Sequence, residues 1–179
     1  MIKKFELDLS SKMTFLGVEL FRIKALISFG NVKEGELGGY VEKEDNLSHS
    51  GNAWVYGDAW VYGDARVYGN ARVYGNARVS GDAEVSGDAW VSGDARVYGN
   101  ARVSGDAEVS KLNDYIVFKN TWSSGRYFTY TTSNKMWKVG CFYGTGEELI
   151  KKAYQDNEDS GKHYEAYVNF VKTLEALDN

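Results

Sequence analysis

The sequence predicts a mainly β protein in which a solenoid of short parallel strands is followed by a small α+β domain. The first observation is a repeat: valine recurs ten times at a strict spacing of six residues, from Val55 to Val109, and alanine stands two positions before each valine. The second is the change in composition after Ser110, where the repeat stops. A fixed period this short is typical of a solenoid, because helices and hairpin meanders do not repeat every six residues.

Each six-residue unit, as in GNARVSGDAEVS, reads as one short strand and one corner. In an extended segment, residues two apart share a face, so the alanine and valine of a unit point inward together. The glycine and the Asp or Asn that follows it tolerate the backbone conformation of a tight corner. The varied positions on either side of the valine are therefore expected to point outward.

The pattern G-[DN]-A-x-V-[YS] resembles the hexapeptide repeat of left-handed parallel β-helices, in which three units close one triangular coil. The flanking blocks FRIKALISFGNVKEGELGGYVEKEDNLSHSGNAWV and YTTSNKMWKVGCFYGTGEELIKKA extend this likeness to hexapeptide-repeat proteins carried by bacteriophages and prophages. The resemblance implies a left-handed parallel β-helix of about three coils. It also implies a homotrimer.

The flanks of the repeat are expected to close its two ends. Residues 1–50 are assigned to a β-rich N-terminal cap, 51–110 to the β-helix, and 111–179 to a small α+β domain of three strands and two helices (β3α2). The expected elements are cap strands at 12–16 and 19–26, domain strands at 114–120, 126–132 and 135–139, and helices at 146–156 and 163–177. Thr145 and Glu148 form the pattern of a capping box at the first of these helices.

Composition excludes several classes of protein. A net charge of −4 argues against a generic nucleic-acid binder. The single cysteine, Cys141, excludes an intrachain disulfide framework, and its setting in VGCFYG predicts a buried small hydrophobe. We expect a cytoplasmic protein, in the host cell if it is phage-encoded, because no apolar run reaches the roughly 20 residues of a membrane span and MIKKFELDLSSK lacks a signal peptide's apolar segment.

Histidine is too scarce for the enzymes that share this kind of repeat. Acyltransferases with left-handed β-helices resemble one another in using a histidine near a loop that interrupts the coils, and 51–110 contains neither. Gamma-class carbonic anhydrases need three histidines for their metal, whereas this chain has His49 and His163. We therefore expect no enzyme, metal or cofactor, and keep a hexapeptide-repeat acyltransferase as a second alternative.

At three units per coil, the varied position before each valine stacks into columns. The columns are Trp54, Arg72, Trp90 and Glu108; Trp60, Arg78 and Arg96; and Arg66, Glu84 and Arg102. Trp and Arg are enriched at protein interfaces. The predicted trimer interface therefore comprises Trp54, Arg72, Trp90, Trp60 and Arg78. The same columns could instead dock a macromolecule, which makes a structural or interaction module the first alternative function.

A ligand site is predicted in the C-terminal domain, where basic and aromatic residues lie near a helix start in the sequence. Arginine presents paired donors to an oxyanion, and Gly-Thr-Gly at a helix N-terminus offers free N–H groups, although Thr145 could serve only as a cap. The predicted ligand residues are Arg126, Trp122, Tyr127, Tyr130, Trp137, Thr145, Gly144 and Gly146. They favour a non-catalytic protein that sequesters a small anionic, nucleotide-derived ligand. The phage resemblance suggests a host immune signal, such as a cyclic dinucleotide or an ADP-ribose derivative.

Overall fold

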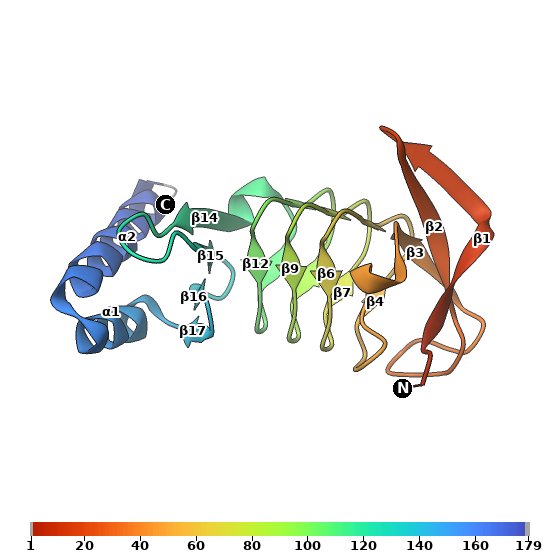
Figure 1. Cartoon of the computed structure of the whole chain (residues 1–179), viewed down its shortest axis with the longest axis horizontal. Helices are drawn as coiled ribbons and strands as arrows, with labels where there is room; N and C mark the ends of the chain where they lie inside the picture. The colour runs from red at the N-terminus through yellow and green to blue at the C-terminus, as the bar shows by residue number, and fades with distance from the viewer. Residues whose placement is uncertain (1, 178–179) are drawn as a thin grey trace.

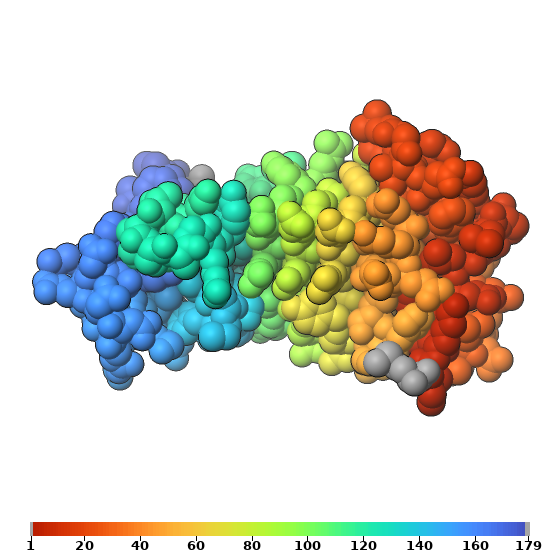
Figure 2. All heavy atoms as spheres, in the orientation of Figure 1, coloured from red at the N-terminus to blue at the C-terminus, as the bar shows by residue number. Residues whose placement is uncertain are grey.

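The computed structural model describes residues 2–177, which form an elongated molecule of three consecutive parts. An N-terminal hairpin stands at one end, the solenoid fills the middle, and the two helices lie at the other end (Figure 1). The space-filling view shows the same order without a break between the parts (Figure 2). No helix within 2–177 is long and apolar enough to cross a membrane.

Ten two-residue strands form the solenoid, one in each six-residue unit. They are β4 (Trp54–Val55), β5 (Trp60–Val61), β6 (Arg66–Val67), β7 (Arg72–Val73), β8 (Arg78–Val79), β9 (Glu84–Val85), β10 (Trp90–Val91), β11 (Arg96–Val97), β12 (Arg102–Val103) and β13 (Glu108–Val109). Each strand from β4 to β10 pairs in parallel with the strand three units later, as in Trp54 with Arg72. This register confirms three units per turn.

The solenoid therefore has three faces. Face 1 carries β5, β8 and β11, face 2 carries β4, β7, β10 and β13, and face 3 carries β6, β9 and β12. The repeated alanines and valines are all buried inside, with at most 1% of their surface exposed. Glycine is required at the corners: Gly69 has φ +73°, and a Cβ there would lie 3.0 Å from the nitrogen of Gly87.

Parallel pairing begins upstream of the repeat. Strand β3 (Leu37–Val41) pairs in parallel with β5, and Leu47 forms a parallel bridge with Val67. Val41 and Leu47 thus occupy the valine position of an earlier turn, so the solenoid has about four turns rather than the expected three. The repeat conceals this turn because its corner is replaced by the short 3-10 helix η1 (Glu44–Asn46).

The N-terminal cap is the long antiparallel hairpin of β1 (Phe5–Phe15) and β2 (Val18–Ala25), which extends face 1 through β3. The C-terminal domain is a four-stranded antiparallel sheet followed by two helices. Its elements are β14 (Tyr115–Lys119), β15 (Tyr127–Thr131), β16 (Met136–Val139), β17 (Phe142–Gly144), α1 (Gly146–Asp156) and α2 (Glu158–Leu177). The sheet thus has one strand more than expected, and α2 begins earlier than residue 163 because the Asn157 side chain accepts the Ser160 N–H.

The two ends of the solenoid have opposite hydrogen-bonding needs. Backbone N–H groups donate toward the next turn, as Trp60 does to the Ala77 carbonyl at 2.9 Å. The first turn of six-residue units therefore needs donors for carbonyl oxygens that the irregular upstream turn does not reach with its backbone, whereas the last turn needs acceptors for its N–H groups. A buried backbone group without a partner is costly, so each end requires a different kind of cap.

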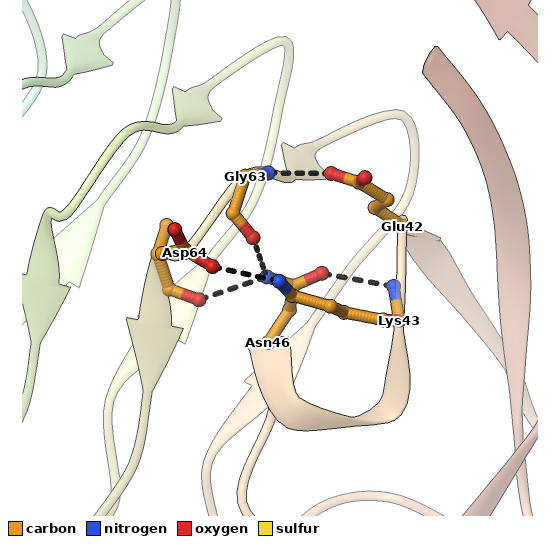
Figure 3. Close-up of polar contacts among 6 residues, drawn as sticks. Glu42, Lys43, Asn46, Gly63 and Asp64 are labelled. Carbon is orange, nitrogen blue, oxygen red and sulfur yellow. Dashed lines mark hydrogen bonds and ion pairs between the residues drawn. The ribbon is translucent and has the colours of Figure 1, made fainter.

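Side chains of the N-terminal region supply the donors. The Asn46 amide donates to the carbonyls of Gly63 at 3.0 Å and Ala65 at 2.9 Å, in place of a backbone strand (Figure 3). Lys43 adds an ion pair to Asp64 at 2.8 Å (Figure 3). On face 2, the buried Lys4 ammonium donates to the Ala53 carbonyl at 2.8 Å.

Hydroxyl groups of the C-terminal domain supply the acceptors. The Thr129 hydroxyl accepts the Arg102 N–H at 2.9 Å, and the Ser133 hydroxyl accepts the Glu108 N–H at 2.8 Å. The Asn134 amide also donates to the Asp106 carboxylate at 2.9 Å, which holds the pKa of Asp106 below its usual value. These contacts fix the domain against the last turn and thereby set which face its loops adjoin.

Candidate functional site

The structure divides the predicted ligand residues among different places. Tyr130, Trp137, Thr145 and Gly146 line one cavity of about 340 Å³ against α2. Arg126 and Tyr127 line a separate cleft of about 540 Å³ against face 3. Trp122 packs elsewhere, with its ring stacked 4.5 Å from that of His163, and Gly144 ends β17. The eight residues therefore do not form one site.

The start of α1 is already capped by its own side chains. The Thr145 hydroxyl accepts the Glu148 N–H at 3.3 Å, and the Glu148 carboxylate accepts the Thr145 N–H at 2.8 Å. Glu147 adds a second negative charge in the first turn. Because these groups satisfy donors and neutralise the positive end of the helix dipole, this terminus is unfavourable for an anion.

The aromatic residues of this cavity belong mainly to the core. Tyr130 and Trp137 each expose only 2% of their surface. The Tyr130 hydroxyl donates to Glu175 at 2.5 Å, and burial together with this carboxylate raises the pKa of Tyr130. Trp122 also has occupied ring faces, since it stacks on Tyr167 as well as His163. These three rings stabilise the domain rather than stand open to a ligand.

The cleft that contains Arg126 is the better candidate, and we call it the arginine cleft. It lies between face 3 and the C-terminal sheet, and its lining residues are Asp64, Arg66, Asp82, Glu84, Asn100, Arg102, Arg126, Tyr127 and Gly140. Strands β6, β9 and β12, which carry three of these side chains, follow one another along the solenoid (Figure 1). The i, i+18 register stacks Arg66, Glu84 and Arg102 in a column.

Ion pairs neutralise only part of this cleft. Arg102 lies 3.8 Å from Glu84, and Asp64 is paired with Lys43, whose ammonium holds the pKa of Asp64 below its usual value. The side chains of Arg66 and Arg126 form no ion pair with any residue in 2–177. Two guanidinium groups in one cleft thus remain available for an anionic partner.

A second cleft, of about 700 Å³, adjoins the first on face 3. Its lining residues are Glu44, Asp45, Leu47, Ser48, His49, Arg66, Val67, Tyr68 and Glu84, and we call it the acidic cleft. His49 is held by the cap: its Nδ1 accepts the Lys4 N–H at 3.1 Å, its Nε2 lies 3.4 Å from Glu44, and its ring stacks on Phe5. With both ring nitrogens engaged, His49 is poorly placed to act as a general base.

The predicted interface residues also differ in their surroundings. The expectation that Trp54 lies on an outer face is wrong: it is fully buried within the chain, with Phe5 and Phe29 at its ring edges. The N-terminal region therefore covers the first residue of the column of Trp54, Arg72, Trp90 and Glu108. Trp60 is flanked by Phe15 of the hairpin and by the Arg78 guanidinium, which lies 4.1 Å from its ring centroid.

Farther along face 2, which also carries Trp54, Trp90 remains 39% exposed, and the Arg72 guanidinium lies 5.5 Å from its ring centroid. The exposed tryptophan of the Trp/Arg columns is therefore on face 2. Cys141 is exposed rather than buried, because it lies in the turn between β16 and β17. Within 2–177, no group of three or more His, Cys, Asp and Glu side chains could hold a metal ion.

One family model matches part of the repeat. The family model described as YdcK Beta solenoid repeat matches residues 65–83, 77–93 and 95–110. No curated protein matches the chain. The family match agrees with the parallel sheets and supports a β-solenoid repeat protein. The match covers only part of the solenoid, so it gives no evidence about the activity of the chain.

Sequence reasoning missed the face-3 residues of the two clefts. It stacked Arg66, Glu84 and Arg102 correctly but did not include them among the predicted ligand residues. The signal that could have found them is the position of the C-terminal domain on the last turn. That position depends on the hydroxyls of Thr129 and Ser133, whose contacts have no sequence motif.

Proposed function

We propose that this protein is a non-catalytic binding protein that captures a small anionic, nucleotide-derived ligand in the arginine cleft. The observation that carries the proposal is the pair of guanidinium groups, on Arg66 and Arg126, that form no ion pair within 4.0 Å among residues 2–177 and lie in one cleft with a 39% exposed Tyr127 ring. Arginine binds phosphate through paired N–H donors. An exposed phenol ring can stack on a base.

The remaining cleft residues fit the other parts of such a ligand. The Asp82 carboxylate and the Asn100 amide can bind ribose hydroxyls, since hydroxyl groups donate to carboxylates and accept from amides. Lys119, whose ammonium lies 5.6 Å from the Tyr127 ring centroid, adds positive charge nearby. A volume of about 540 Å³ falls in the range typical of small-molecule pockets.

The proposal includes an assembly and a setting. It assigns a left-handed β-helix of the hexapeptide-repeat type and a homotrimer, in which a neighbouring subunit completes the cleft. It places the protein in the cytoplasm of an infected host cell, where a phage-encoded binder would sequester a nucleotide immune signal without degrading it. The phage setting rests on the sequence resemblance.

The direct test is to incubate the protein with a panel of nucleotides, cyclic dinucleotides and ADP-ribose derivatives, isolate it, heat it and identify what is released. We expect one class to be retained and recovered intact. Arg126→Ala should weaken its binding by about 1.5–3 kcal/mol. Arg96→Ala is the matched control, because Arg96 is an exposed arginine of the same repeat on face 1. Degraded ligand would contradict sequestration, and no retention would contradict the proposal.

Trp90 favours a second candidate function, the docking of a macromolecule on face 2. An exposed tryptophan with an arginine over its ring is typical of an interface anchor. Under this alternative, Trp90→Ala would abolish capture of the partner while leaving nucleotide binding unchanged. An acyltransferase has less support, since the engaged nitrogens of His49 leave it without an evident base.

A further inference from the structure

The arginine cleft and the acidic cleft are adjacent parts of one groove along face 3. Both are lined by Arg66 and Glu84, which belong to neighbouring turns of the same column. Each cleft has the volume of a small-molecule pocket, about 540 and 700 Å³. A ligand bound beside Arg66 can therefore extend toward either end of the groove.

The two parts of the groove differ in charge. The arginine cleft contains three guanidinium groups, from Arg66, Arg102 and Arg126, and three carboxylates. Of these carboxylates, Glu84 is paired with Arg102 and Asp64 with Lys43, whereas Asp82 forms no ion pair among residues 2–177. The acidic cleft contains Arg66 together with the carboxylates of Glu44, which is paired with Lys3 at 2.7 Å, and of Asp45 and Glu84. A phosphate is therefore favoured toward the C-terminal domain. Toward the N-terminal cap, carboxylate oxygens can accept hydrogen bonds from the amino and ring N–H groups of a base.

Each part also offers one open aromatic ring. Tyr127 is 39% exposed in the arginine cleft, and Tyr68 is 37% exposed in the acidic cleft. Arg66 lines both clefts and so lies within reach of a ligand in either. The Tyr68 hydroxyl donates to Glu84 at 3.2 Å, which holds one edge of the phenol to face 3. The groove thus has two stacking surfaces and cationic groups along its length.

We propose that the ligand is a dinucleotide whose phosphate linkage lies against the arginines and whose second base stacks on Tyr68. That base is one with several N–H donors on its edge, as guanine has, because carboxylates line its cleft. This inference rests on the proposed function and names its ligand class. It adds Tyr68 and the acidic cleft to the binding site.

Calorimetry on the full chain with two probes, GMP and the linear dinucleotide pGpG, tests the inference. We expect pGpG to bind at least about tenfold more tightly than GMP. Tyr68→Ala should weaken pGpG binding by roughly 5- to 150-fold, which corresponds to 1–3 kcal/mol for one stacked base. It should leave GMP binding within about twofold. Tyr68→Phe keeps the ring and should retain most of the pGpG affinity.

Tyr98→Ala is the matched control, because Tyr98 is 52% exposed at the same position of the repeat on face 1. Melting temperatures establish that each variant is folded. If GMP binds but pGpG binds no more tightly, or if Tyr68→Ala weakens both probes equally, the two-cleft inference is wrong and the proposed function stands. If neither probe binds to the folded protein, the two-cleft inference is wrong, and the proposed function fails as well only if no member of the wider nucleotide panel is retained.

Discussion

Replacement of Asn46 by aspartate tests how the first turn of six-residue units is closed on its N-terminal side. Asn46 is fully buried, and its amide nitrogen donates to the carbonyls of Gly63 and Ala65 (Figure 3). Its Oδ1 accepts the Lys43 N–H at 2.9 Å. Aspartate has nearly the same shape but, when ionised, no donor. The substitution therefore removes two hydrogen bonds and places a carboxylate oxygen against two carbonyls.

The expected loss of stability follows from these contacts. Each lost hydrogen bond costs about 1 kcal/mol net, and a buried carbonyl left without a donor costs roughly 1–3 kcal/mol. Partial access of water to the Gly63 side reduces the second figure, because that hydrogen bond is only partly buried. We therefore expect Asn46→Asp to lower the free energy of unfolding by roughly 3–5 kcal/mol.

Urea denaturation followed by tryptophan fluorescence measures this change, since Trp54 and Trp60 lie beside the cap. Asn52→Asp is the matched control. Asn52 also donates from its amide, to Asn70 at 3.1 Å, but this bond is exposed. We expect the control to change stability by less than about 1 kcal/mol. A similarly small effect of Asn46→Asp would refute the idea that side-chain donors are needed to close this end.

Three further changes have defined outcomes. Burial lowers the pKa of Lys4 to about 8. Between pH 8 and 9.5 the unfolded chain therefore binds more protons than the folded chain, and the free energy of unfolding should rise by roughly 1–2 kcal/mol with pH. Urea denaturation across this range should show no such rise in Lys4→Met. Val79→Asp should prevent folding, because it buries an unpaired charge inside the solenoid, and circular dichroism would detect the loss of structure. Trp54→Ala should cost about 3–5 kcal/mol in thermal unfolding by leaving a cavity, whereas Trp90→Ala should cost less than about 1.

The solenoid could be predicted because one local rule generates it. Each unit combines an Ala-x-Val strand with a glycine corner, and repetition of the rule fixes the register at 18 residues. The upstream turn was missed because Val41 and Leu47 occupy the inward position without that corner chemistry. A short 3-10 helix and the Asn46 side chain take the place of the glycine corner. Because these features do not repeat in the sequence, periodicity could not reveal them.

The candidate site could be predicted only in part. Arg126 and Tyr127 were identified from composition, and both line a cleft. Trp137 and Tyr130 were read as ligand contacts, but an aromatic residue in a small domain is first needed to fill its core. Sequence distance also gave no indication that Arg66 and Arg126 lie on the same cleft. Their proximity arises from the docking of the C-terminal domain, which depends on tertiary contacts.

The threefold geometry restricts how the length of such a chain can change. Inserting or deleting 18 residues adds or removes one full turn, about 4.8 Å of groove, and leaves the C-terminal domain above the same face. A change of six or twelve residues would instead rotate that domain by one or two faces relative to the hairpin, and would separate Arg126 from the column of Arg66. Natural or engineered versions that keep this groove should therefore differ in length by whole turns, which makes groove length adjustable in discrete steps.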